Sequence, residues 1–207
     1  MSTVAQAFLT GGVSGSAEAG QAAGALAALV ERARFGDAHA FDRLMIETQE
    51  KVLSVAWRML GSREDARDAA QEVFVRVYRH LSRFRAGEDI QGWLYRITVN
   101  VCRDASRRRR RSPIASCEAP EPFVSASAEE TLILAERRSA VLEALDCLPV
   151  KERAALVLRD LEGFTSEEAA RILGSRPGTV RAQIAAARIR IRAHCRRVFG
   201  AEIGGNR

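Results

Sequence analysis

Paired cysteines and clustered histidines are missing from this 207-residue sequence. The four cysteines, Cys102, Cys117, Cys147 and Cys195, lie far apart and form no C-x-x-C pair, and the three histidines add no ligand spacing. We therefore expect free thiols, as in a reducing cytoplasm, and no metal or other cofactor. The N-terminus has no basic segment followed by an apolar run, and no apolar run is long enough to span a bilayer. Both absences predict a cytoplasmic protein.

Motifs of catalysis are also missing: we find no glycine-rich nucleotide loop, no paired metal-ligand spacing and no serine-nucleophile motif. This argues against an enzyme with a small-molecule substrate. Lysine is scarce, since Lys51 and Lys151 are the only two, yet the net charge is +6. An arginine-rich basic chain favours a polyanionic partner, because guanidinium groups make bidentate contacts with phosphate and guanine. GC-rich codons would give the same arginine bias.

The stretch from residue 165 to residue 192 carries the signals of two short helices joined by a tight turn. Thr165 can cap the first helix, and Glu168 stands three residues later, where a capping box needs it. Gly174 can end that helix in the left-handed conformation, and Pro177 suits the first position of the next. These signals predict a helix-turn-helix.

The second of these helices has one apolar and one basic face. The apolar face would consist of Val180, Ile184, Ala187 and Ile191. The opposite face carries Arg181, Arg188 and Arg192, and no acidic residue occurs from Arg176 to Phe199. This pattern favours a recognition helix for the major groove of DNA. The alternative is an ordinary helical hairpin with a solvated basic face.

The rest of the chain is expected to be all-α as well. Residues 1–22 are rich in small residues, which predicts a disordered tail. Residues 112–128 hold three prolines with serines and acids, as is typical of a flexible linker. Apolar periodicity predicts helices over 22–36, 37–60, 63–83, 91–109, 129–146 and 150–161. The sequence thus predicts two small helical domains, residues 23–111 and 129–199, and a C-terminal tail over 200–207.

Two polar helix faces in the first domain are each open to two interpretations. Asp68, Gln71 and Glu72 lie on the charged side of the helix over 63–83, whose apolar side includes Phe74 and Tyr78. That charged side is either solvated surface or a site for a partner. On the next helix a polar row recurs at i, i+4, i+7 and i+11: Arg96, Asn100, Arg103 and Arg107. Such a row can follow phosphates and read a base edge, or simply be solvated.

In combination, these segments resemble the extracytoplasmic-function (ECF) sigma factors, the small two-domain branch of the bacterial sigma-70 family. DAAQEVF (68–74) is similar to the family's region 2.2, and GWLYRITVN (92–100) is similar to its region 2.3–2.4 helix. LEGFTSEEAA (161–170) and GTVR (178–181) are similar to region 4. The resemblance covers about residues 24–199 in the family's order.

The resemblance implies a non-catalytic protein that directs core RNA polymerase to promoters and assists melting of the −10 element. Asp68, Gln71 and Glu72 would dock on the clamp helices of the largest subunit, and the second domain would meet the flap of the second subunit. The implied −10 contacts are Phe84, Arg85, Arg96, Asn100, Arg103 and Arg107, and the implied −35 contacts are Thr179, Arg181, Gln183 and Arg188. An anti-sigma factor is a further expected partner. The alternative is a stand-alone helix-turn-helix regulator that needs no polymerase.

Overall fold

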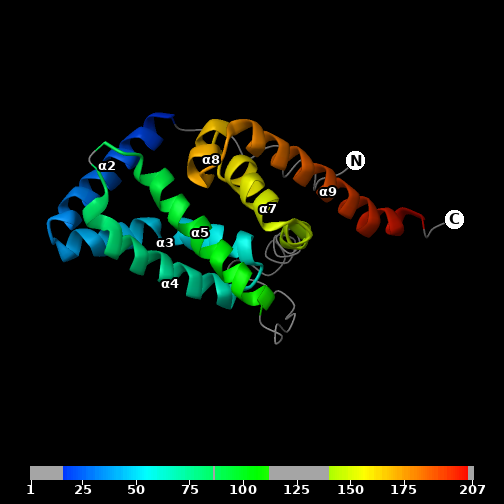
Figure 1. The fold of residues 1–207 in the computed structure, drawn as a ribbon, viewed down its shortest axis with the longest axis horizontal. Helices are drawn as coiled ribbons and strands as arrows, with labels where there is room; N and C mark the ends of the chain where they lie inside the picture. Colours follow the sequence, from blue (N-terminus) through cyan, green and yellow to red (C-terminus); the bar gives the residue numbers. More distant parts are fainter. Residues whose placement is uncertain (1–15, 86, 112–139, 205–207) are drawn as a thin grey trace, which may run out of the picture.

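The first half of the chain folds as a helical bundle. The computed structural model describes residues 16–85, 87–111 and 140–204, with side chains over 24–85, 87–109 and 140–197. The bundle consists of α2 (Ser16–Arg34), α3 (Ala38–Leu60), α4 (Arg63–His80), the short 3₁₀ helix η1 (Leu81–Arg83) and α5 (Ile90–Arg111). α3 packs against α2, α4 and α5, so it forms the centre of the bundle (Figure 1).

The second half is smaller and ends in a long helix. Residues 140–146 are helical, and α7 (Val150–Leu156) continues directly into a π-helical turn, η2 (Val157–Leu161). α8 (Ser166–Leu173) and α9 (Pro177–Gly204) complete this half. α9 packs on both α7 and α8, and its C-terminal half projects away from them (Figure 1).

Local signals in the sequence set several helix ends. The Asp37 carboxylate caps α3 by accepting from the Ala40 amide at 3.0 Å, and Ser62 caps α4 by accepting from the Asp65 amide at 3.2 Å. Between them, Gly61 ends α3 with φ of 75°, a left-handed conformation that glycine adopts without steric cost. The predicted helix boundaries in this region are therefore confirmed to within a residue or two.

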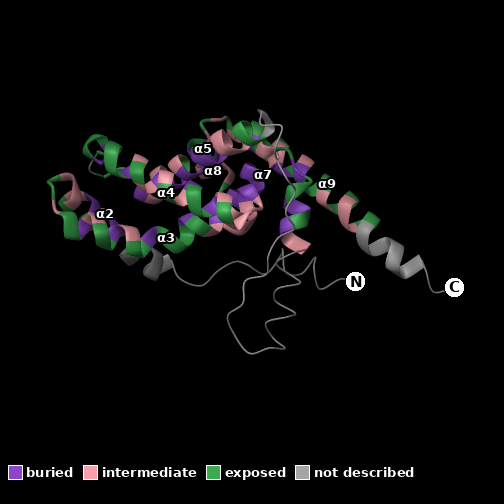
Figure 2. Ribbon diagram, turned by 90° about the horizontal axis from the view of Figure 1, so that it is seen from below, coloured by how far each residue is buried: buried purple, intermediate pink, exposed green. Residues whose placement is uncertain are grey.

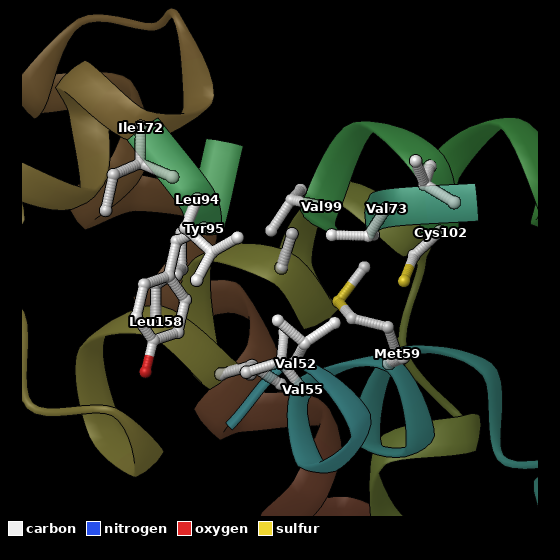
Figure 3. Packing of buried hydrophobic residues seen from close by; sticks show 14 of the residues in the cluster. Val52, Val55, Met59, Val73, Leu94, Tyr95, Val99, Cys102, Leu158 and Ile172 are labelled. Atoms are coloured by element: carbon white, nitrogen blue, oxygen red, sulfur yellow. The ribbon is translucent and has the colours of Figure 1, made fainter. Parts of the chain in front are cut away.

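The two halves share one hydrophobic core. Figure 3 shows Leu94 and Tyr95 of α5 beside Leu158 of η2 and Ile172 of α8, and all four belong to a single cluster of buried residues. Figure 2 shows buried positions recurring along the helices of both halves. The sequence predicted two tethered domains, and this direct packing of one against the other was not predicted.

Other boundaries differ from the prediction or lie beyond what is described. α2 begins at Ser16, inside the segment expected to be a disordered tail. The linker expected over 112–128 and the first residues of the helix expected over 129–146 fall outside the described residues. Across the part of the chain that the structure describes, no helix has the length and apolar character needed to cross a bilayer.

Candidate nucleic-acid and protein interfaces

The predicted helix-turn-helix is formed by α8 and α9. The Thr165 hydroxyl accepts from the Glu168 amide at 3.2 Å, and the Glu168 carboxylate accepts from the Thr165 amide at 2.8 Å. This is the predicted capping box, and its amide hydrogen bond is the main cause that lowers the pKa of Glu168. Gly174 ends α8 with φ of 60°, and Val180 is fully buried where α9 crosses α8. The turn therefore orients α9 as the sequence predicted.

The first turns of α9 present polar side chains to solvent. Thr179 and Arg181 are exposed and Gln183 is half-buried. Arg181 forms an ion pair with Glu167 of α8 at 3.0 Å, and both side chains are 61% exposed. Because water screens such a pair, it contributes little free energy and breaks easily. Arg181 is therefore available for an anion that approaches α9.

Arg188, two turns further along α9, is held by a second helix. Its guanidinium donates two hydrogen bonds, of 3.0 and 2.8 Å, to the carboxylate of Asp160 in η2, and this pairing raises the pKa of Arg188. The Asp160 side chain is only 11% exposed, whereas that of Arg188 is 51% exposed. The bidentate pair fixes α9 against η2, a structural role that sequence reasoning missed.

The polar row of α5 lies on one side of the bundle, as its spacing predicted. Arg96 and Asn100 are exposed, and Arg107 is exposed with a loose ion pair of 3.7 Å to Asp104. Arg103 is half-buried, and its pKa is lowered first by burial and then by the nearby charge of Arg107. A partly desolvated guanidinium next to another favours the approach of an anion.

Phe84 corrects the expectation that it contacts DNA. It is 3% exposed and packs on Trp93, with ring centroids 5.2 Å apart. Its side chain belongs to the hydrophobic core, and at the end of η1 its backbone amide donates to the Leu81 carbonyl. The adjacent Arg85 is exposed and remains available at the surface.

α3 and α4 enclose an open apolar groove on the surface of the bundle. The groove is lined by Phe41, Met45, Gln49, Glu50, Leu53, Arg67, Ala70, Gln71, Phe74, Val75, Tyr78 and Arg79. Three of these apolar residues, Leu53, Val75 and Tyr78, are exposed by 37%, 42% and 68%. The sequence had placed Tyr78 on the buried side of its helix. Instead its ring packs edge-on against Phe41, with centroids 5.1 Å apart, at the rim of the groove.

The three predicted docking residues all lie on α4. Gln71 lines it, and both Gln71 and Asp68 are exposed. Glu72 is half-buried and accepts a hydrogen bond of 2.7 Å from Arg76, which in turn pairs with Asp104 of α5 at 3.3 Å. The apolar neighbours of Gln71 are functional candidates that sequence reasoning missed. The sequence did contain a sign of them, because the apolar stripe on α4 is wider than the strip that packing against a single helix would bury.

Over the described residues, no group of histidine, cysteine, aspartate and glutamate side chains could hold a metal ion. Cys102 is buried in the bundle, and burial raises the pKa of its thiol to about 12. A thiol in that environment is a packing residue rather than a ligand or nucleophile.

A helical bundle followed by a helix-turn-helix unit, each with exposed arginines on one helix, defines a class of two-domain helical DNA-binding proteins. The chain matches the family model of Sigma-70 region 2 over residues 44–112 and that of Sigma-70, region 4 over residues 138–191. Two arginine-bearing helices, α5 and the first turns of α9, fall one in each matched region.

Relatives agree with these matches. The RNA polymerase sigma-H factor of Pseudomonas aeruginosa is 35% identical over 77% of this chain and 88% of its own length. The ECF RNA polymerase sigma-E factor of Escherichia coli is 39% identical, also over 77% of this chain and 88% of its own length. The chain therefore belongs to the ECF RNA polymerase sigma factors of the sigma-70 family, which are non-catalytic initiation factors.

Solved structures share the fold. CnrH in complex with the cytosolic domain of CnrY matches with a TM-score of 0.63 and 26% identity, covering 84% of this chain and 99% of that one. The sigma factor RpoE of Bartonella quintana, solved with the anti-sigma factor NepR, matches with a TM-score of 0.58 and 22% identity. The match covers 74% of this chain and 94% of the Bartonella quintana chain.

Proposed function

We propose that this sigma factor holds core RNA polymerase through the groove between α3 and α4, and promoter DNA through α5 and α9. The observation that carries the proposal is the separation of surfaces. An apolar groove and two arginine-bearing helix faces lie on different elements. The chain makes and breaks no bond in this function. Its binding energy alone would shift the equilibrium between closed and melted promoter.

The groove suits a helical partner. Its floor is apolar, and Gln71 and Arg67 at its edge supply hydrogen-bond donors. An exposed apolar strip rimmed by polar groups is typical of a protein-binding site. We assign the clamp helices of the largest polymerase subunit to it, as the family resemblance implies, with Asp68 and Glu72 as further contacts from α4. The flap of the second subunit is assigned to the helix-turn-helix unit on the same resemblance.

α5 is assigned to the −10 element. Asn100 is exposed and has the donor and acceptor needed to read a base edge. Arg96, Arg103 and Arg107 extend from it along one side of α5, where guanidinium groups can follow a phosphate backbone, and Arg85 adds charge before the helix begins. If these groups bind the open strand more tightly than the duplex, they would assist melting of the promoter.

The first turns of α9 are assigned to the major groove at the −35 element. Thr179 and Arg181 face solvent where a recognition helix makes its base and phosphate contacts. Gln183 can pair with adenine through its amide. Arg188 contributes a phosphate contact from its exposed half while it remains bound to Asp160.

A protein inhibitor is a further proposed partner. The related CnrH was solved bound to a cytosolic domain of CnrY, and the resemblance to ECF sigma factors implies an anti-sigma factor. Because polymerase works in the bacterial cytoplasm, we place the active protein there.

The docking role is tested with purified chain and core polymerase. We expect Gln71→Ala and Asp68→Ala each to weaken core binding by about tenfold, the effect of losing roughly 1.4 kcal/mol. Asp42→Ala is the matched control, because Asp42 is exposed on α3 and does not line the groove. Equal affinities for all four proteins would reject the groove as the docking site.

The DNA roles are tested by run-off transcription on genomic DNA, followed by binding to a mapped promoter. Arg181→Ala should reduce the salt dependence of promoter binding by about one unit of slope. Asn100→Ala should lower permanganate reactivity of unpaired thymines more than it lowers duplex binding. A chain that retards the duplex equally well without core enzyme would favour the stand-alone regulator instead.

A further inference from the structure

The recognition helix α9 continues beyond the part of the chain that matches the family. The match to Sigma-70, region 4 ends at residue 191, whereas α9 runs on to Gly204. Figure 1 shows this end of α9 projecting away from α7 and α8. Within it, Arg192, Arg196 and Arg197 are exposed. A basic, solvent-exposed segment thus follows directly on the helix that is assigned to the −35 element.

The arginines of α9 differ in whether a carboxylate neutralises them. Those before residue 191 in the second and third turns each form an ion pair of 2.8 to 3.0 Å with an acidic side chain of α7, η2 or α8: Arg181, Arg188 and Arg190. Arg192 and Arg196 form no ion pair with any residue that the structure describes. The neighbouring sequence offers no acid either, since none occurs from Arg176 to Phe199. Their charge is therefore available to an anion from outside the chain.

Both arginines lie on the side of α9 that is assigned to DNA. Successive residues of an α-helix turn by about 100°, so Arg192 and Arg196 lie about 20° and 60° around the axis from Arg181. The buried residues Val180 and Ile184 lie on the other side of α9. Along the axis, the two arginines are on the order of 16 and 22 Å from Arg181. The face that begins at Arg181 therefore continues as a basic stripe to the projecting end.

This stripe is longer than the major groove is wide. The groove of B-form DNA measures about 12 Å between its bordering phosphate strands. A helix that crosses the groove with its first turns therefore has its later turns at one of those strands. The planar guanidinium matches a phosphate and can contact it through two donors. Contacts of this kind fix position and add affinity, but they read no base.

We propose that Arg192 and Arg196 bind the phosphate backbone of double-stranded DNA at the border of the −35 element, and so extend the contact of α9 beyond the bases that its first turns read. The proposal rests on the −35 role proposed above for α9. Continuity with the face of Arg181 favours DNA over an acidic protein surface. Such contacts should strengthen binding to every promoter alike and leave the choice among −35 sequences to the first turns.

The test uses holoenzyme assembled from core polymerase and the full chain carrying Arg192→Gln and Arg196→Gln together. Glutamine keeps a high helix propensity and removes both charges. Arg43→Gln with Lys51→Gln is the matched control, because both residues are exposed on α3 and the same charge is removed. Each phosphate contact contributes about 0.9 to the slope of log K against log salt. Between 50 and 200 mM salt, wild type and control should therefore lose roughly tenfold more affinity for a mapped promoter than the double variant loses.

A change in the DNA tests where these contacts are made. Methylphosphonate linkages, which carry no charge, replace single phosphates on either border of the −35 element. At one border they should weaken binding of wild type and have no effect on the double variant, whose side chains no longer bind there. Base substitutions within the −35 element should cost wild type and the double variant the same factor in affinity.

The outcomes distinguish this proposal from the function on which it rests. Equal salt slopes for wild type and the double variant, or methylphosphonates that weaken both equally, would overturn it. So would a double variant that binds DNA normally but core polymerase weakly, because the extension would then contact protein. If Arg181→Ala leaves promoter binding unchanged, the −35 role of α9 fails while the double variant still tests the extension. If no holoenzyme binds a promoter, fluorescence anisotropy of the full chain with a labelled duplex at low salt decides, and equal affinities there would also reject the proposal.

Discussion

Replacement of Arg153 by methionine tests how the two halves are held together from inside. Arg153 is 7% exposed, and its guanidinium lies where two helices end. It donates at 2.9 Å to the carbonyl of Met59 in the last turn of α3, and at 2.9 Å to the carbonyl and the carboxylate of Asp146. A longer contact of 3.4 Å reaches the carbonyl of Leu148. One buried cation thus satisfies C-terminal carbonyls of helices from both halves.

The expected loss follows from these contacts. Hydrogen bonds to a charged group contribute about 1.5–3 kcal/mol each. The gross gain is offset by several kcal/mol for burying the guanidinium, whose Nε finds no partner within the described residues. Arg153→Met keeps the side-chain volume but leaves the Met59 and Asp146 carbonyls without their donor. We expect a net loss of about 3 kcal/mol, or a fall in Tm of roughly 6–12 °C for a chain of this size.

Urea unfolding followed by two signals provides the assay. Trp57 and Trp93, the only two tryptophans, both lie in the first half, so fluorescence reports that half and far-UV circular dichroism reports both. The two transitions should coincide in wild type and separate in Arg153→Met. Arg153→Lys should be intermediate in stability between wild type and Arg153→Met, because lysine keeps the positive charge but has fewer hydrogen-bond donors.

Arg159→Met is the matched control for this prediction. Arg159 is exposed in the adjacent π-helical turn, so its loss should stay within about 0.5 kcal/mol. A loss below about 1 kcal/mol for Arg153→Met, or a loss equal to that of the control, would refute the assignment of Arg153 as a shared cap.

Three further predictions concern local chemistry. Thr165→Ala should destabilise the helix-turn-helix by about 1 kcal/mol in urea unfolding, and an unchanged midpoint would contradict the capping role. Because the Thr165 amide lowers the pKa of Glu168, the stabilisation from Glu168 is present above its unfolded pKa and lost as pH falls through its folded value. Acid unfolding of Glu168→Gln should therefore depend less on pH below about 4.5 than that of wild type; parallel curves would exclude this linkage. Iodoacetamide at pH 8 should alkylate the exposed Cys147 and leave Cys102 unmodified, as read by peptide mass mapping, since burial holds the Cys102 thiol protonated. Modification of both at one rate would show that the bundle core opens freely.

The sequence determined the helices well because their signals are local. Thr165 stands directly before a helix and makes the predicted cap, and Asp37 and Ser62, also directly before helices, cap theirs in the same way. Gly61 and Gly174 stand after helices and adopt the left-handed conformation that ends them. Such signals act within four residues, so no knowledge of the remainder of the fold is needed to read them.

Side-chain environments were harder to predict where a third element decides them. Tyr78 lies at the margin of the apolar stripe of α4, and it is exposed because, within the described part of the chain, no helix covers the groove beside α3. Phe84 belongs to a loop with no periodicity, and its burial depends on Trp93, nine residues later. Hydrophobic pattern gives the direction of a stripe but not its width, and the width depends on tertiary packing.

The π-helical turn η2 shows how one local feature creates several long-range contacts. Asp160, within this turn, contacts α9, and Glu162, the residue after the turn, contacts α3 and α5. Residues i and i+2 of a regular α-helix point about 200° apart. Asp160 and Glu162 can therefore contact different helices, provided that their own helix ends directly after them. Gly163, with φ of 79°, provides that end. Asp160 would then stabilise the second half itself, and Glu162 would stabilise its packing on the first half. Substitutions at these two positions should therefore separate folding of the helix-turn-helix unit from its packing on the bundle.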